Sequence, residues 1–123
     1  MDTVLRVAVC DDDSMERAVL QKHIMECGVP AACTLFASAE ELLEEYYAGR
    51  FDLVIMDIYM MGMDGFETFE HIRSICDTPI LFITADDDQD MQQRARTIGA
   101  QGCLIKPFAP ELLRESVHRY AHC

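Results

Sequence analysis

Apolar segments that no polar residue interrupts alternate with longer amphipathic segments along the chain, and this alternation limits the folds that it can adopt. The apolar segments lie at residues 7–10, 53–56, 80–83 and 103–105, with a weaker one at 33–36. Short uninterrupted segments of this kind are typical of strands buried on both faces, as in parallel sheets. Between them apolar residues recur at helical spacing, so we expect five strand–helix units.

The expected helices have start signals ahead of their apolar positions. Three pairs of residues have the spacing of an N-cap and its capping-box glutamate: Asp13 with Glu16, Ser38 with Glu41, and Asp64 with Glu67. Pro110 suits the first turn of the last helix. Parallel strands joined by right-handed helical crossovers form a doubly wound three-layer α/β sandwich, in which a binding site lies at the carboxyl ends of the strands.

The length and net charge of the chain limit the number of domains and the kinds of partner that we expect. A chain of 123 residues, half of them apolar, can bury one core, so we expect a single domain over residues 1–123. Its formal net charge of -12 disfavours direct binding of nucleic acid or of an anionic membrane surface. The sequence has no run typical of a signal peptide or a membrane span, and its six scattered cysteines lack a C-x-x-C pair. We therefore expect a cytoplasmic protein with reduced thiols.

Polar side chains gather where the expected strands end. Asp11 and Asp12 follow the first strand, Asp57 follows the third, Thr84 ends the fourth and Lys106 follows the fifth. Two carboxylates within ~4 Å of each other repel by about 4 kcal/mol at an effective dielectric near 20, so such a cluster needs a cation. Hard oxygen ligands select Mg²⁺ or a similar ion. A single aspartate here could merely cap a helix, and it is the combination that indicates a site.

These residues stand in four motifs that resemble the receiver domain of bacterial response regulators. The motifs are Val9-Cys10-Asp11-Asp12-Asp13, residues 57–65, Thr84-Ala85 and Lys106-Pro107-Phe108. They occur in the same order and at matching spacing over essentially the whole chain. The resemblance implies a flavodoxin-like sandwich with a five-stranded parallel sheet in the order 2-1-3-4-5. The first motif is also similar to regulators with a DNA-binding output domain of the LytTR type.

The resemblance implies a phosphoacceptor switch rather than an enzyme. A histidine kinase would transfer a phosphoryl group to Asp57, and Mg²⁺ would be held by Asp11, Asp12, Asp57 and the backbone carbonyl of Tyr59. Thr84 and Lys106 would contact the phosphoryl oxygens. The family pattern further implies a cis peptide bond between Lys106 and Pro107. It also implies that Tyr59 and Asp86 flank the path of hydrolytic water.

The same resemblance suggests partners for the output. We expect a sensor histidine kinase, a possible homodimer through the fourth helix, fifth strand and fifth helix (about residues 90–122), and a possible output domain beyond Cys123. Met61 stands where the family often has proline. Cys103 stands where it often has an aromatic switch residue, so we expect the fourth helix, with Met91 and Arg94, to carry the signal. Phe108 could instead take the switching role.

Two other classes of protein share parts of this pattern. A phosphatase of the haloacid-dehalogenase type also forms an aspartyl phosphate after a strand, but it needs an acid two residues later, where this chain has Tyr59. A flavodoxin-like cofactor binder shares the fold but needs a Ser-, Thr- or Gly-rich loop after the first strand. This chain has three aspartates there.

Overall fold

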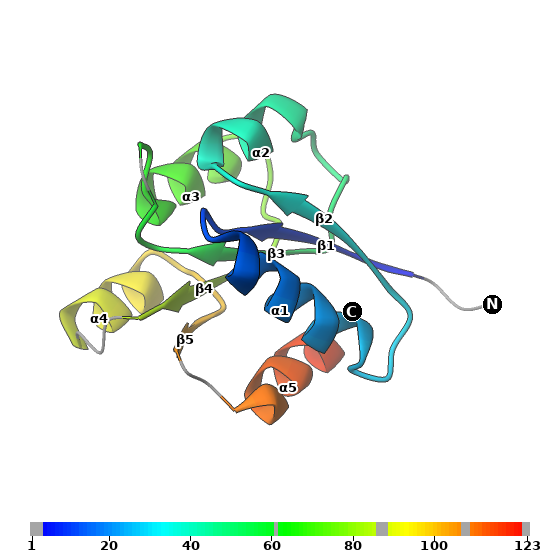
Figure 1. The fold of residues 1–123 in the computed structure, drawn as a ribbon. Coiled ribbons are helices and arrows are strands. Elements are labelled where there is room, and N and C mark those ends of the chain that lie inside the picture. The colour runs from blue at the N-terminus through cyan, green and yellow to red at the C-terminus, as the bar shows by residue number, and fades with distance from the viewer. Residues whose placement is uncertain (1–3, 61, 86–88, 107–108, 122–123) are drawn as a thin grey trace.

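The computed structural model describes residues 4–60, 62–85, 89–106 and 109–121, and five strands alternate with five helices along them. The elements are β1 Leu5–Cys10, α1 Ser14–Met25, β2 Ala31–Phe36, α2 Ala39–Glu45, β3 Leu53–Asp57, α3 Gly65–Arg73, β4 Ile80–Thr84, α4 Gln89–Thr97, β5 Gly102–Ile105 and α5 Pro110–Ala121. All strands pair in parallel in the order β2-β1-β3-β4-β5 (Figure 1). The predicted fold is confirmed.

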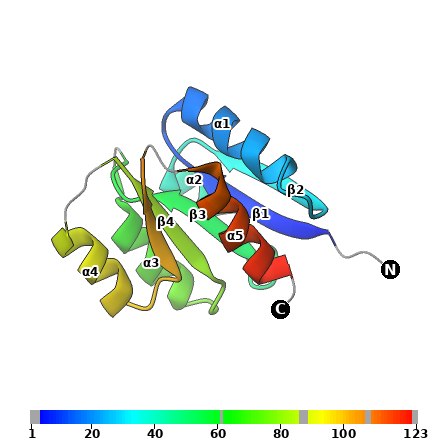
Figure 2. The same ribbon diagram turned by 90° about the horizontal axis from the view of Figure 1, so that it is seen from below.

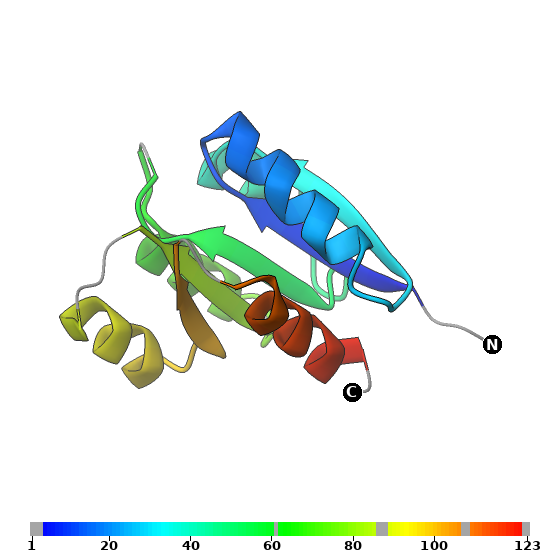
Figure 3. The same ribbon diagram turned by 60° about the horizontal axis from the view of Figure 1, so that its bottom comes forward.

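The sheet lies between two layers of helices. α1 and α5 lie in front of it in Figure 3, with α2 and α3 behind, and Figure 2 shows α4 beside β5 at the edge of the sheet. β3 shows why the strands have no polar interruption: Val54 and Met56 face the core under α2, α3 and α4, whereas Leu53 and Ile55 face the core under α1 and α5. All four side chains are fully buried. Both faces of the central strands therefore require apolar residues.

The predicted N-caps are confirmed, with two differences in the capping boxes. Glu41 accepts a hydrogen bond from the Ala37 N–H at 3.0 Å, one residue before the Ser38 N-cap. Asp13 caps α1 by accepting hydrogen bonds from the backbone N–H groups of Met15 and Glu16, at 2.9 and 3.3 Å. Ser38 and Asp64 cap α2 and α3 in the same way, and Pro110 is the first residue of α5. However, the Asp13 N–H donates to Asp11 Oδ1 at 2.9 Å rather than to the predicted capping-box partner Glu16. The Glu16 side chain is therefore available for another contact.

Gly65 holds the amino end of α3 against the end of β3. Its N–H donates to the Ile58 carbonyl oxygen at 2.8 Å. A Cβ at this position would lie 2.9 Å from Ile58 Cα and 3.0 Å from the Asp57 carbonyl oxygen, too close for any side chain. The absence of a side chain thus lets the helix approach the backbone that carries Asp57.

Two further predictions concern the state of the cysteines and membrane-spanning segments. Within the described ranges the cysteines are all free, as predicted: Cys10, Cys27, Cys33, Cys76 and Cys103. Cys123 lies outside these ranges. None of the described helices is long and apolar enough to cross a membrane.

Candidate functional site

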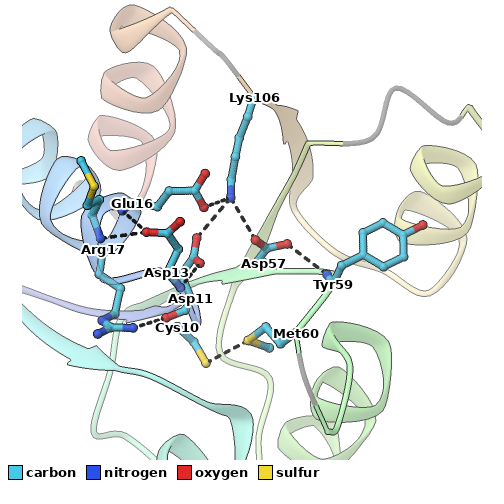
Figure 4. A network of polar contacts seen from close by, with 10 residues as sticks. Cys10, Asp11, Asp13, Glu16, Arg17, Asp57, Tyr59, Met60 and Lys106 are labelled. Atoms are coloured by element: carbon cyan, nitrogen blue, oxygen red, sulfur yellow. Dashed lines mark hydrogen bonds and ion pairs between the residues drawn. The ribbon is translucent and has the colours of Figure 1, made fainter.

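Four elements of the sheet bring polar side chains to its carboxyl edge. Asp11 follows β1, Asp57 is the last residue of β3, Thr84 is the last residue of β4, and Lys106 follows β5. Asp11 and Thr84 are fully buried, and Asp57 is 7% exposed. Figure 4 shows the side chains of Asp11, Asp57 and Lys106 pointing toward one another. The clustering expected from the sequence is therefore present for these residues.

Lys106 lies at the centre of this cluster. Its Nζ is 2.9 Å from Asp57 Oδ2 and 3.2 Å from Asp11 Oδ2, and it also donates to Glu16 Oε2 (Figure 4). Burial lowers the pKa of the ammonium, but its hydrogen bonds to Glu16 and Asp57 raise that pKa above its usual value on balance. An ammonium has three N–H donors, and here each has a carboxylate partner. Lys106 is therefore a charged group held in place by three acids.

The two buried aspartates are destabilised as anions. Burial raises the pKa of Asp57, against the effect of Lys106 and of the Tyr59 N–H, which donates to Asp57 Oδ1 at 3.0 Å. Burial also raises the pKa of Asp11, although the Asp13 N–H and Lys106 act in the opposite direction. Removing a carboxylate from water costs free energy that a nearby cation offsets. The pair consequently favours a second positive charge beside Lys106.

Glu16 joins the site from α1, and the sequence reasoning assigned it only to helix capping. One oxygen each of Asp11, Glu16 and Asp57 lies within 4.8 Å of the others. The Glu16 side chain is 40% exposed, compared with 0% for that of Asp11. Its place in the first turn of the helix that follows β1 was the available signal, because that turn lies at the same sheet edge.

Asp12 and Tyr59, two predicted metal ligands, are placed differently from Asp11 and Asp57. Asp12 is exposed and is not part of the group formed by Asp11, Glu16 and Asp57. The Tyr59 ring points away from the carboxylates in Figure 4 and is 46% exposed. The ligand roles of Asp12 and of the Tyr59 carbonyl stay predictions, as does the place of Tyr59 beside the path of hydrolytic water.

Arg17 fixes the acidic loop after β1, and the sequence reasoning did not identify it. Its guanidinium donates to the Asp11 carbonyl oxygen at 2.6 Å. On the other side of the same strand end, Cys10 Sγ donates to Met60 Sδ at 3.6 Å. These contacts hold the backbone around Asp11 from the helix and from the loop that follows Asp57. A basic residue in the first turn of α1 was the only sequence signal for this role.

A hollow of about 570 Å³ opens beside Lys106. It is lined mainly by apolar side chains of α1, with contributions from the strand ends: Met15, Glu16, Val19, Leu20, His23, Ala85 and Lys106. Met15 and Val19 are 77% and 50% exposed. The site can therefore be approached across an apolar surface of α1.

Aromatic contacts connect α4 to the interior of the sheet. The Arg94 guanidinium lies 4.1 Å from the centroid of the Phe66 ring, and that ring lies 5.2 Å from Phe82. Phe82 is two residues before Thr84 on β4 and pairs in register with Cys103 of β5. Cys103 is half-buried and packs against the core under α4. These contacts join β4, the strand that Thr84 ends, to α4.

Several sequence predictions fall on residues outside the described ranges. These are the roles of Met61, Asp86 and Phe108, and the cis Lys106–Pro107 bond. They stay predictions.

Comparison of the sequence with known proteins finds one matching family model and a set of relatives. The family model described as response regulator receiver domain matches residues 7–118. The two-component response regulator ARR2 of Arabidopsis thaliana is 38% identical over 111 residues, which cover 89% of this chain but 17% of that protein. Other plant regulators that match are likewise covered over only 16% to 21% of their length.

Solved structures agree with the observed fold. The chemotaxis response regulator CheY4 of Vibrio cholerae is 30% identical, with a TM-score of 0.78 over 96% of this chain and 99% of that one. The BeF3-activated DrrB receiver domain is 23% identical, with a TM-score of 0.82 over 98% of this chain and 100% of that one, and this likeness concerns the fold alone.

Proposed function

The chain belongs to the response regulator receiver family, and from that premise we propose that Asp57 is its phosphoacceptor. The observation that carries the proposal is the environment of this carboxylate. Asp57 ends the central strand β3, is nearly buried, and has Lys106 on one oxygen and the Tyr59 N–H on the other. A receiver domain is the phosphorylated switch of a two-component system. Asp11 has the same two kinds of donor, Lys106 and a backbone N–H, but it is fully buried, whereas Asp57 is 7% exposed and is the acid that a phosphodonor can reach.

The proposed reaction needs an available nucleophile and compensation of charge. An Asp57 oxygen attacks the phosphorus of a phosphohistidine, a new O–P bond forms, and the P–N bond to the donor imidazole breaks. The electron pair of that bond goes to the imidazole, which takes up a proton from water and leaves as a neutral ring, and the product is an acyl phosphate. Lys106 offsets the charge on the transferred group from a position that it already occupies. Because the donor supplies the energy-rich bond, the domain acts as a regulatory phosphoacceptor and turns over no metabolite.

The site residues fit the Mg²⁺ that receiver domains bind at their acidic pocket. Asp11 and Asp57 offer hard oxygen ligands whose burial calls for a cation. We assign the ion to these two carboxylates, with Asp12 and the Tyr59 carbonyl as further ligands. When bound, Mg²⁺ would supply positive charge to the phosphoryl oxygens in addition to that of Lys106.

We propose that phosphorylation of Asp57 changes the surface of the molecule through Thr84 and α4. The Thr84 hydroxyl is fully buried at the end of β4, and in this proposal it turns to donate to a phosphoryl oxygen. Phe82 lies two residues earlier on the same strand, its ring packs against that of Phe66, and Phe66 contacts Arg94 of α4. We expect α4, including the half-buried Met91, to shift between two arrangements.

The proposed partners are a sensor histidine kinase, a second copy of the chain and an output domain. Receiver domains work with histidine kinases and output domains, and we propose that a sensor kinase reaches Asp57 across the apolar hollow beside Lys106. Dimerisation through α4, β5 and α5 is a proposal supported by Leu112 of α5, which is 47% exposed. The LytTR-type output, the cytoplasmic location and the lack of direct nucleic-acid binding stay predictions.

Neither alternative class gains support. The position two residues beyond Asp57 holds Tyr59 rather than the acid of a dehalogenase-type phosphatase. The loop after β1 is acidic, which opposes the phosphate of a flavin.

The test is phosphorylation by a small donor. Incubated with acetyl phosphate and Mg²⁺, the protein should gain one phosphoryl group by intact-mass spectrometry, and a chelator should suppress the gain. Labelling that is undiminished by the chelator would overturn the metal-assisted phosphoacceptor reaction.

A further inference from the structure

The Lys106 ammonium contacts three acids: the proposed phosphoacceptor Asp57, its buried neighbour Asp11, and Glu16. Asp11 and Asp57 come from the sheet, whereas Glu16 reaches the same nitrogen from the first turn of α1. An acid in the first turn of a helix commonly interacts with the helix dipole alone, and it need not bind a lysine of another element. Glu16 therefore has a specific contact that its place in the helix does not explain.

We propose that Glu16 is a positioning residue that competes with the phosphoryl group for the Lys106 ammonium and is displaced from it when Asp57 is phosphorylated. The inference rests on the proposed role of Asp57.

The number of donors limits how many anions Lys106 can bind at once. All three N–H groups of Lys106 already have carboxylate partners. A phosphoryl group on Asp57 brings additional oxygens that need at least one of these donors. The phosphoryl oxygens, which carry nearly two negative charges, then compete with the carboxylates for the same three donors.

Exposure indicates which partner leaves. The Asp11 side chain is fully buried and also accepts the Asp13 N–H, so it is fixed in place and cannot turn into water. Asp57 carries the phosphoryl group itself. The Glu16 side chain is 40% exposed, so water can solvate its carboxylate once it turns away. Glu16 is the partner that the phosphoryl group can replace at the lowest cost.

Because Glu16 is negatively charged, removing its charge should change the affinities for a cation and for an anion in opposite directions. A negative charge next to the site favours a bound cation and opposes a bound anion. Glu16→Gln keeps the length of the side chain and removes the charge. It should therefore strengthen binding of a phosphoryl analogue and weaken binding of Mg²⁺, each by roughly three- to tenfold for a charge at this range.

The experiment titrates the whole chain with Mg²⁺ alone, and then with beryllofluoride at saturating Mg²⁺, by isothermal titration calorimetry. The control is Glu26→Gln, which makes the same charge change at the far end of α1, about 15 Å along the helix at 1.5 Å per residue. Opposite changes in the two affinities for Glu16→Gln, with neither in the control, support the inference. A merely structural role would weaken both ligands together.

The other outcomes are equally decisive. Weaker binding of both ligands would make Glu16 a metal ligand or a structural residue and overturn the inference. Affinities equal to those of Glu26→Gln would show that its contact with Lys106 has no effect on the phosphorylated state. If the unchanged protein bound no beryllofluoride, the proposed function would fail and the inference with it.

A second variant covers poor folding of the first. Glu16→Asp keeps the charge but shortens the side chain by one methylene, which moves the carboxylate away from Lys106. Beryllofluoride should bind this variant more tightly than the unchanged protein, by a smaller factor than Glu16→Gln. Binding no tighter than that of the unchanged protein would contradict displacement of Glu16.

Discussion

Lys106 Nζ lies 2.9 Å from Asp57 Oδ2, so the ammonium already contacts the carboxylate that we propose as the nucleophile. The contact joins the end of β3 to the residue after β5, across β4. Because the lysine is in place before any phosphoryl group arrives, no reorganisation of this charge is needed during the reaction.

Removing the Lys106 charge should separate metal binding from phosphorylation. In Lys106→Met the acids lose their cation, so Mg²⁺ should bind more tightly, while the phosphoryl group loses its compensating charge. We expect the rate of labelling by acetyl phosphate to fall by ~10- to 100-fold. Intact-mass time courses and Mg²⁺ titrations measure the two effects. A labelling rate equal to that of the unchanged protein would exclude the proposed role of Lys106.

Gly65→Ala should destabilise the fold through the close approach of α3 to β3. The new Cβ would meet Ile58 Cα at 2.9 Å, and backbone cannot move aside as a flexible side chain can. We expect the free energy of unfolding to fall by about 1–3 kcal/mol. The control is Gly102→Ala, whose Cβ would meet Leu81 Cδ1 at 3.4 Å in ordinary contact. Urea unfolding followed by circular dichroism compares them, and equal losses would refute the explanation.

The fold and half of the site could be predicted because both depend on regular geometry. Parallel strands place their carboxyl ends at one edge, which brings Asp11, Asp57 and Lys106 together wherever such a sheet forms. Asp12 could not be placed in the same way, because neighbouring residues that leave a strand point in different directions. The place of Glu16 in the first turn of α1 indicated only that it lies near the same sheet edge. It could not show that its flexible side chain contacts Lys106 rather than the backbone of its own N-cap.

The thiols should differ in reactivity according to their environments. Although burial opposes it, hydrogen bonding by Thr78 and Tyr46 lowers the pKa of Cys76, whereas burial raises that of Cys33 to about 11 and that of Cys10 to about 12. Only the thiolate reacts with iodoacetamide. As pH rises from 7 to 9, Cys76 should therefore be alkylated first and Cys10 last.

Peptide mapping of the native protein after timed alkylation measures this order. Denatured protein, in which the three sites should react alike, is the control. Alkylation of Cys10 before Cys76 would contradict the described burial.

Cys103 should not be needed to transmit the signal. Its small side chain packs under α4, and we expect the contact between Arg94 and Phe66 to carry the displacement instead. On addition of beryllofluoride and Mg²⁺, hydrogen exchange in α4 should change equally in Cys103→Ser and in the unchanged protein. In Arg94→Met the change should be reduced.

Arg96→Met, on the same helix, is the matched control for Arg94→Met. Loss of the α4 response in Cys103→Ser, with labelling of Asp57 preserved, would make the thiol part of the route after all.

The position of the acyl phosphate tests the central claim most directly. After reaction with acetyl phosphate and Mg²⁺, borohydride reduction converts an acyl phosphate to an alcohol that peptide mass spectrometry can locate. The account predicts this product at Asp57, its disappearance in Asp57→Asn, and its persistence in Asp77→Asn, which alters an exposed aspartate. Reduction at another carboxylate, or equal labelling of Asp57→Asn, would contradict it.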